Sequence, residues 1–456
     1  MRSRSGIFHT LVAGVSAWVL ASCSAVQVSQ YSEQARASNV VPESWEYPSE
    51  TGTSVTALTE LVSSDELSAL VQQALEANPG LQQALVTLKI AQLERVQARA
   101  NLLPSATASL DAGRSDGSDA SFSPSLSVSW EVDLWNRLDD KLNAADLDIQ
   151  SARYTFQAAR DSLAASVLRQ GLLLIYQQQL SDLEASRLSL LETQSALTEQ
   201  RYRSGLVEVE ALHSARQQAA SSRATLAAYQ QAVQEARQDL AGLIGQPVDA
   251  LNWTVPGALP DVVMPLATLP DQDLHRRPDL QAAYLDILSQ ESSATAAYKA
   301  LLPSLSLSAA LSDSSTSLTQ SLFRDPVWSL LGSLSAPLFN GGTLRAQAEI
   351  EELSAAKAYW AYQQTLLNAT TEVENGLSRE TSYAAQEQAT VAALSASEAT
   401  VTSYETRFRQ GLVSRLEWIE QALNVWSLKA QLAEIRYNRL SNRVDLGLAL
   451  GLGADK

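Results

Sequence analysis

The chain has few of the side chains on which most enzyme chemistry depends. Its 456 residues include one cysteine, Cys23, and three histidines, one of which is His9 near the N-terminus. A single cysteine cannot form an intramolecular disulfide. The sequence also has no nucleophile elbow, no zinc-type histidine pair and no phosphate-binding loop. We therefore expect a protein that is not an enzyme and that holds no metal.

Basic residues are scarce as well. Lys and Arg total 33 against 50 Asp and Glu, a formal net charge of −17. Without Arg2 and Arg4, which lie in the N-terminal signal described next, 31 basic residues remain and the charge is near −19. Binding to phosphate backbones needs clustered Lys and Arg, so this balance argues against nucleic acid as a partner.

The start of the chain combines basic residues with a mostly apolar stretch. Arg2 and Arg4 precede a mostly apolar stretch from 7 to 20, and Leu20-Ala21-Ser22-Cys23 follows directly. This order is typical of a secretory signal, and the run is too short for a membrane-spanning helix. Cys23 is then either a leftover thiol or the attachment point of a covalent lipid, because Leu-Ala-Ser-Cys resembles a bacterial lipobox. Ser24 follows it, and the sorting rule for such lipoproteins then favours the outer membrane.

No later stretch approaches 18 apolar residues, so no transmembrane helix is expected after the signal. If the rest of the chain crosses a bilayer, it must do so as a closed β-barrel, because only helices and barrels satisfy every backbone hydrogen bond in lipid.

The remaining sequence contains an internal duplication. Four short motifs recur in the same order, first 199 and then 206 residues further along. They are Pro79/Pro278, Leu103-Pro104-Ser105/Leu302-Pro303-Ser304, Arg201 to Val207/Arg407 to Val413, and Asp239-Leu240/Asp445-Leu446. The kept order and the small drift predict two copies of one structural unit.

Two long stretches lack proline and are dominated by good helix formers. Proline is absent between Pro124 and Pro247 and after Pro337, and apolar residues return at helical spacing. A helix from about 138 to 202 would be roughly 100 Å long at 1.5 Å per residue, which suits a coiled coil or a tube. Gly171 and Gly376 fall within these helices and predict a bend or a close helix contact.

Each long helix ends on the same signal. Arginines occupy the last turn, where cations favour the negative end of the helix dipole, and Gly205 or Gly411 follows as a C-cap. A second helix restarts at once, with Ser414 and Glu417 spaced as a capping box. We therefore expect one long antiparallel helical hairpin with a tight tip in each half.

Between the helices lie four segments with alternating side chains. The clearest runs from Ser125 to Leu134, where every even position is apolar and every odd position polar. Alternation over about ten residues is the span of an outer-membrane strand, although a soluble antiparallel sheet with one wet face gives the same pattern. The serine-rich polar face favours a wide lumen. Four strands cannot close a barrel, so several chains would have to share one.

These signals divide the chain into five parts. Residues 1–22 are a signal peptide, 23–64 a tether, and 65–245 the first repeat, with strands at about 104–134 and a hairpin at about 138–245. Residues 246–275 form a proline-containing linker. Residues 276–456 are the second repeat, with strands at about 303–338 and a hairpin at about 342–451.

With these features together, the chain resembles the TolC-like outer membrane factor family, particularly its lipoprotein branch that serves multidrug efflux pumps. The motifs similar to those of the family are Arg276 to Ala283, Leu302-Pro303-Ser304-Leu305, Pro337 to Gly342, and the Arg-Phe-x-x-Gly-Leu-Val tip. The resemblance implies an α+β membrane protein whose homotrimer forms a twelve-stranded β-barrel continuing into a twelve-helix periplasmic α-barrel. It further implies a passive exit duct for small molecules such as drugs, gated at the helix tips. The implied partners are outer-membrane lipid, a periplasmic adaptor and an inner-membrane pump; the only attached group is the lipid on Cys23.

Two sites are expected within this resemblance. The tips Gly205-Leu206-Val207 and Gly411-Leu412-Val413 would dock the adaptor, although both could be no more than tight turns. Glu417 and Glu420 match the acidic residues that ring the periplasmic entrance in family members, although a capping box alone would explain Glu417. Their first-half equivalents are Ala211 and Ser214, so the second half alone would supply the ring.

The tips also depart from the family pattern. Some members hold the closed tip with an Arg–Asp pair, and here those two positions are Val413 and Ala211. The alternative to a channel is a coiled-coil lipoprotein that acts as a tethered spacer without a pore. The alternating strands argue against it, while the cargo, the pump and the adaptor stay open.

Overall fold

The structure is a computed structural model that describes residues 29–37, 42–46, 55–117, 119–265, 267, 270–317 and 325–454. Cys23, the expected lipid attachment point, lies outside these ranges. No helix in the described part of the chain is both long enough and apolar enough to cross a membrane.

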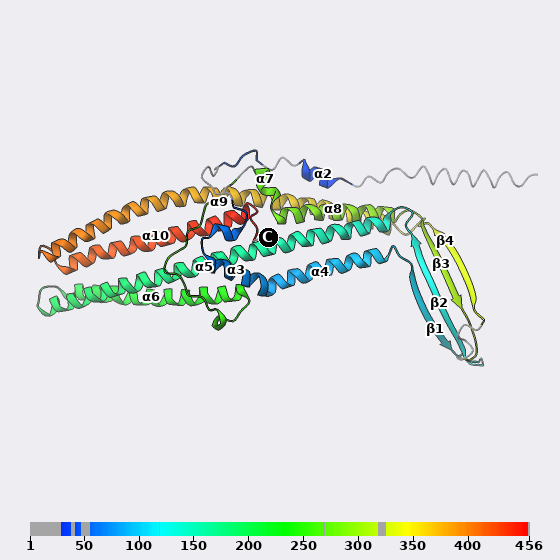
Figure 1. Ribbon diagram of the computed structural model, residues 1–456, viewed down its shortest axis with the longest axis horizontal. Helices are drawn as coiled ribbons and strands as arrows, with labels where there is room; N and C mark the ends of the chain where they lie inside the picture. The colour runs from blue at the N-terminus through cyan, green and yellow to red at the C-terminus, as the bar shows by residue number, and fades with distance from the viewer. Residues whose placement is uncertain are drawn as a thin grey trace, which may run out of the picture. The chain divides into compact units, whose positions relative to one another are not determined.

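The helices and strands follow one another in the same order twice (Figure 1). The first round is α4 (Pro79–Ala100), β1 (Ser105–Gly113), β2 (Ser121–Val132), α5 (Arg137–Arg203) and α6 (Val209–Ile244). The second is α8 (Pro278–Lys299), β3 (Ser304–Ser312), β4 (Val327–Ser335), α9 (Thr343–Arg409) and α10 (Arg415–Ala449). Within the described ranges, shorter helices flank these rounds: α2 (Tyr31–Arg36), η1 (Leu58–Leu61), α3 (Asp65–Ala77), η2 (Val248–Ala250) and α7 (Pro270–His275).

The described residues form two compact units, and neither unit corresponds to one sequence repeat. One unit combines 87–153 with 282–364 and α2; the other combines 154–281 with 365–454 and the segment from 42 to 86. Each unit therefore draws on both halves, because the long helices α5 and α9, with 67 residues each, contribute to both units.

In the first unit, the described residues form an antiparallel sheet in the order β1-β2-β3-β4. β1 and β2 come from the first repeat, and β3 and β4 come from the second. The pairing of β2 with β3 joins the two halves of the sheet. The β1–β2 loop spans 114–120 and the β3–β4 loop spans 313–326, which is seven residues longer. This extra length accounts for the change in repeat offset from 199 to 206.

The second unit is built around a buried apolar cluster, in which α3 packs on α5 and η1 packs on α10. Leu58, Leu67, Leu168, Leu172 and Ile175 are fully buried there. A Cβ at Gly171 would lie 2.4 Å from Leu67 Cδ2, and one at Gly376 would lie 3.0 Å from Leu446 Cδ1. Both glycines therefore mark close contacts, the second of the two possibilities raised by the sequence.

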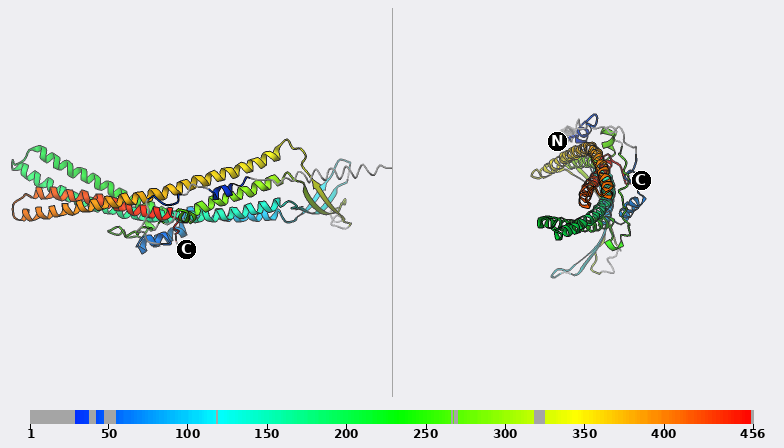
Figure 2. Two further views of the ribbon diagram at one scale, coloured as in Figure 1. Left: turned by 90° about the horizontal axis from the view of Figure 1, so that it is seen from above. Right: turned by 90° about the vertical axis from the view of Figure 1, so that its left-hand side faces the viewer.

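The two helical hairpins of this unit end in turns of the same type. α5 with α6, and α9 with α10, run side by side, and both tips lie at the same end of the unit (Figures 1 and 2). At each tip a glycine adopts a left-handed conformation, with φ of 71° at Gly205 and 74° at Gly411. Leu206 N donates to Arg201 O at 2.9 Å, and Leu412 N donates to Arg407 O at 2.8 Å. These are Schellman caps, which satisfy the last helix carbonyls.

Candidate functional site

The two tips present equivalent apolar side chains to solvent. Leu206 is 67% exposed and Leu412 is 66% exposed, and each follows the capping glycine. In a Schellman cap the residue in this position usually packs back on its own helix. Here about two thirds of each leucine is exposed instead, and Val207 and Val413 beside them are half-buried. The structure thus brings the six predicted tip residues into two copies of one protruding apolar turn.

Ion pairs on the last turns flank both tips. Arg203 contacts Glu199 at 2.5 Å and Arg216 contacts the same carboxylate at 3.1 Å. Hydrogen bonds from Arg216 and then Arg203 lower the pKa of Glu199. At the second tip Arg409 pairs with Glu405. Exposed i,i+4 pairs of this kind contribute little to stability, so they mainly set the charge around the leucines.

The carboxylates of Glu417 and Glu420 differ in their hydrogen bonding. Glu417 Oε2 accepts hydrogen bonds from Ser414 N and Ser414 Oγ, both at 2.7 Å, which completes the predicted capping box. The Ser414 backbone and hydroxyl donors, with smaller contributions from Arg407 and Arg201, lower the pKa of Glu417. Glu420 is exposed, and its carboxylate makes no hydrogen bond or ion pair within the described residues. The two carboxylates are therefore not equivalent.

The first tip carries acidic residues that the sequence analysis passed over. Glu208 and Glu210 are both exposed at the start of α6, and Glu208 is its N-cap without a side-chain capping bond. The repeat comparison hid them, because their second-half equivalents are Ser414 and Leu416. The Glu-x-Glu spacing directly after the first tip could have identified them as acidic tip residues.

The sheet has one apolar face and one hydroxyl face, and the strand register keeps them separate. Ala106 lies opposite Val128, and Leu126 opposite Leu311, while Ser129 lies opposite Ser308. Across β3 and β4, Ala309 pairs with Leu330 and Leu311 with Trp328 on the apolar side. The hydroxyl side includes serine pairs bridged at 2.9 Å (Ser105, Ser129) and 2.7 Å (Ser109, Ser125). The sorting is complete in β1 and β2, whereas Ala310 of β3 and Val327 and Leu331 of β4 lie on the hydroxyl face.

Charge is nearly absent from this sheet. No Lys, Arg or His occurs in the four strands, and their carboxylates are Asp111 and Glu131. Both lie on the hydroxyl face, and Arg137 pairs with Glu131 at 2.6 Å. Large apolar side chains on the opposite face, among them Trp328, Leu330 and Leu334, are exposed. An apolar face of this size on a sheet suits contact with lipid better than contact with water.

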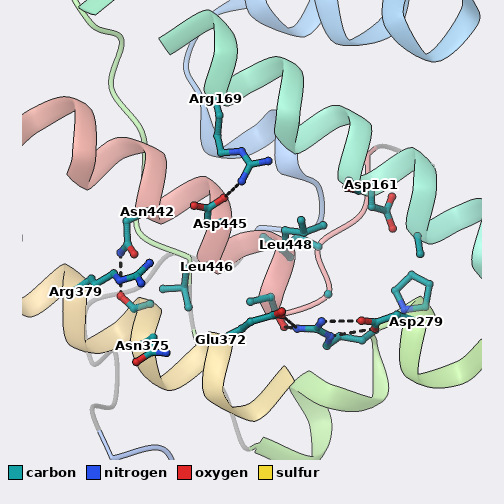
Figure 3. A pocket seen from close by; sticks show the side chains of 18 residues that line it. Asp161, Arg169, Asp279, Glu372, Asn375, Arg379, Asn442, Asp445, Leu446 and Leu448 are labelled. Atoms are coloured by element: carbon teal, nitrogen blue, oxygen red, sulfur yellow. Dashed lines mark hydrogen bonds and ion pairs between the residues drawn. The ribbon is translucent and has the colours of Figure 1, made fainter. Parts of the chain in front are cut away.

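A cavity of about 470 Å³ that several charged side chains line lies in the second unit, where α5, α8, α9 and α10 meet (Figure 3). Arg277 is 8% exposed and donates to Asp279 at 2.7 and 3.1 Å, to Glu372 at 2.8 Å and to Ala449 O at 3.1 Å. Arg169 pairs with Asp445 at 2.6 Å on another wall. Because these charges are paired with one another, the cavity serves as a structural junction. Sequence reasoning identified Arg277 only as part of a family-like motif.

No group of three or more His, Cys, Asp or Glu side chains in the described ranges is placed to hold a metal ion. Cys23, the remaining predicted site residue, is outside those ranges.

Comparison with known proteins gives a consistent result in both halves. The model of the family described as outer membrane efflux protein matches residues 70–246 and 269–452. The chain is 30% identical over 427 residues to the pyoverdine export outer membrane protein OpmQ of Pseudomonas aeruginosa, covering 85% of each chain. It is 27% identical over 340 residues to the cation efflux system protein CusC of Escherichia coli K12, covering 73% of each.

A solved structure agrees at the level of the fold. The open state of the Neisseria gonorrhoeae MtrE outer membrane channel superposes with a TM-score of 0.80 at 24% identity, covering 91% of this chain and 96% of that chain. The α+β fold class expected from the sequence, mostly helical with a small sheet, is confirmed.

Proposed function

Because the chain belongs to the outer membrane efflux protein family, we propose that it is the exit channel of a tripartite efflux system. Members of the family are outer membrane efflux proteins, which are transporters and not enzymes. In the proposed role, small molecules pass passively from an inner-membrane pump and a periplasmic adaptor to the exterior. A lipid on Cys23 anchors the chain, and no cofactor takes part.

The observation that carries this proposal is the sorting of side chains across all four strands. A wall between lipid and a water-filled passage needs apolar side chains on one face and polar ones on the other. The register supplies both across the four strands, with Val327 and Leu331 of β4 as large apolar exceptions on the hydroxyl face. One chain leaves β1 and β4 as open edges, and unpaired edges are excluded from lipid. Three copies of the chain would join into one closed sheet of twelve strands.

The tips are proposed to act in docking and gating. The exposed Leu206 and Leu412 offer matching apolar contacts for an adaptor at the end of each hairpin. Glu420, with Glu417 beside it, would form an acidic constriction in the trimer, where carboxylates favour cations over anions. Glu208 and Glu210 extend the same charge to the first tip.

The cargo is proposed to be a small organic molecule. OpmQ is named for pyoverdine export and CusC for cation efflux. Transition-metal cations of the softer kind prefer thiolate, thioether or imidazole ligands. The full chain has one cysteine, two methionines and three histidines, which is a poor supply of such ligands and favours the organic class.

Two neighbouring substitutions on β2 test the assignment of the faces. We expect Leu126→Lys to block assembly in the outer membrane, because a lysine facing lipid near the bilayer midplane costs about 2–4 kcal/mol per chain. Ser127→Lys is the matched control: it adds the same charge one residue along on the hydroxyl face, and we expect normal amounts of assembled protein. The measurement is the assembled protein in outer-membrane fractions. Equal loss in both variants would show that the faces are wrongly assigned.

Substitution of Glu420 tests the acidic constriction. We expect Glu420→Gln to lower the ratio of cation to anion permeability in planar bilayers, because it removes an unpaired carboxylate. Glu417→Gln should change it less, since Glu417 is already held by Ser414 and glutamine can keep the capping box. Unchanged selectivity in Glu420→Gln would argue against the ring. Glu208 and Glu210 would then be the next carboxylates to substitute.

A further inference from the structure

A second cavity of the second unit lies between α5, α9, α10 and residues 257–262 of the linker. This linker cavity has a volume of about 800 Å³, which is within the range of small-molecule sites. In a chain with a formal net charge of −17, α10 alone gives its lining four cations: Lys429, Arg436, Arg439 and Arg443. Large apolar side chains lie beside them: Leu183, Trp426, Leu432 and Leu440.

The three arginines of the linker cavity share two carboxylates. Arg439 and Arg443 both donate to Glu380 Oε1, at 2.9 and 2.8 Å. Arg436 and Arg439 both donate to Glu387, at 2.9 and 2.8 Å. One positive charge is therefore left over within this network.

Arg436 is the member of the network that is open to solvent. Its side chain is 51% exposed, and its Nε donates to Glu387. The two terminal nitrogens make no hydrogen bond within the described residues, in contrast to those of the buried Arg277. Two free N–H groups on one planar guanidinium suit an anionic group with two oxygens, such as a carboxylate or a sulfonate.

Trp426 provides an apolar contact on the same helix. Its side chain is half-buried, and Lys429 Nζ lies 5.5 Å from its ring centroid. Trp426 and Arg436 are ten residues apart in the sequence, which is about 15 Å along α10. A ligand that contacts both side chains must therefore be elongated, with an apolar body and the charge at one end.

The first hairpin shows which of these contacts serve the architecture of both repeats. At an offset of 206, the ion pair of Lys429 with Glu398 (3.1 Å) corresponds to that of Arg223 with Glu192 (2.6 Å). Arg443 corresponds to Arg237, and each donates to a carbonyl oxygen of the linker segment that follows α6. These contacts are common to both hairpins, so they need no ligand to explain them.

The other residues of the linker cavity have no such counterparts. Ala220, Gln230, Val233 and Ser181 are the first-repeat equivalents of Trp426, Arg436, Arg439 and Glu387. The first hairpin thus folds in the same way without the tryptophan and without the shared carboxylate. The second hairpin has acquired both an aromatic surface and an excess cation beside one cavity, and a binding site accounts for both.

Two further carboxylates limit the charge that a ligand can carry. Asp182 on α5 and Asp261 on the linker also line the cavity, and both residues are exposed. Neither forms an ion pair with a cation of the described residues. They would repel a ligand with several negative charges, so a single anionic group is favoured.

We propose that the linker cavity binds a small organic monoanion with an elongated apolar body. The oxygens of the anionic group accept hydrogen bonds from the terminal nitrogens of Arg436. The apolar body lies along Leu432 and against the ring of Trp426. This inference goes beyond the exit channel, because the site depends on neither the sheet nor the hairpin tips.

Two probes of the same shape test the site in the detergent-purified full chain. They are the para-biphenylcarboxylate ion and the neutral para-biphenylmethanol, titrated calorimetrically against protein-free micelles. We expect saturable binding of the acid and weaker binding of the alcohol. Arg436→Gln should lower the affinity for the acid roughly 10–100-fold, because charge-assisted hydrogen bonds are lost. It should leave the affinity for the alcohol unchanged.

Arg216→Gln is the matched control for the charge. Arg216 is 54% exposed and pairs with Glu199 near the first tip, much as Arg436 is 51% exposed and pairs with Glu387. We expect this control to leave both affinities unchanged. Equal weakening by Arg436→Gln and Arg216→Gln would show a general effect of surface charge and would overturn the site.

Ala433→Leu is a second variant that keeps the whole charge network. Ala433 lines the linker cavity between Trp426 and Arg436 in the sequence, so a larger side chain there should weaken binding of the acid and the alcohol alike. Normal binding in this variant would overturn the location of the site. Equal affinities of the unaltered protein for acid and alcohol would overturn the ligand class. A protein that conducts ions in planar bilayers but does not bind the acid would overturn this inference and leave the channel intact.

Discussion

Replacing Arg277 by alanine is expected to lower the free energy of unfolding by about 2–3 kcal/mol. Its nearly buried guanidinium bonds Asp279, Glu372 and the Ala449 carbonyl. Hydrogen bonds to charged groups contribute about 1.5–3 kcal/mol each when their loss leaves a buried partner. The side chains of Asp279 and Glu372 are 38% and 55% exposed, so water replaces part of what they lose. The measurement is denaturant unfolding of the detergent-purified protein, followed by tryptophan fluorescence.

Arg169→Ala is the matched control on the wall of the same cavity. Arg169 also pairs with a carboxylate, Asp445, but the two side chains are 38% and 42% exposed. An exposed pair contributes at most about 1 kcal/mol, so its removal should have a much smaller effect. Equal destabilisation by both substitutions would show that burial of Arg277 is not what makes it important.

The first repeat explains why an arginine is needed at this position. Asn78 is the equivalent residue, and its side-chain amide donates to Leu243 O at 2.8 Å, while its carbonyl accepts from Leu81 N at 2.9 Å. Both residues therefore cap the end of the second helix in their hairpin. Arg277 also joins Glu372 on α9, a connection that Asn78 is too short to make. The two repeats therefore share the capping role, and the second repeat also has an ion pair.

Local signals gave most of the fold from the sequence. Alternation over β2 predicted a strand, and the glycines at both tips predicted turns, because each depends on residues within a few positions. The capping box of Ser414 and Glu417 is confirmed for the same reason. The repeat offsets also located the longer β3–β4 loop, although only the structure connected the seven-residue drift with that loop.

Contacts between residues far apart in the chain could not be predicted in this way. Residues 23–64 were predicted only as a tether, yet Trp45 is buried and its Nε1 donates to Asp273 at 3.0 Å. The Arg277 junction likewise brings together residues from 277 to 449. A single sequence contains no periodicity that connects such positions, since their pairing depends on how the long helices pack.

The second large effect is expected at the tips. Changing Leu206 and Leu412 to aspartate together should abolish efflux in cells that depend on this protein, because it removes two apolar contacts from the proposed adaptor interface. At about 1.5 kcal/mol for each leucine, the adaptor affinity of every copy falls roughly 100-fold. Both leucines are exposed, so the unfolding free energy should stay unchanged. Efflux of a fluorescent dye and co-purification of the adaptor are the measurements.

Ser204→Asp with Gln410→Asp separates lost apolar contact from added charge. These exposed residues precede the same two glycines, so the variant adds two aspartates per chain at the same tips and keeps both leucines. If docking depends on Leu206 and Leu412, this control retains most of the efflux. If both variants fail equally, repulsion by the added carboxylates is the cause, and the leucines have no special role. If neither variant affects efflux, the tips are simple turns and the adaptor must bind elsewhere on the hairpins.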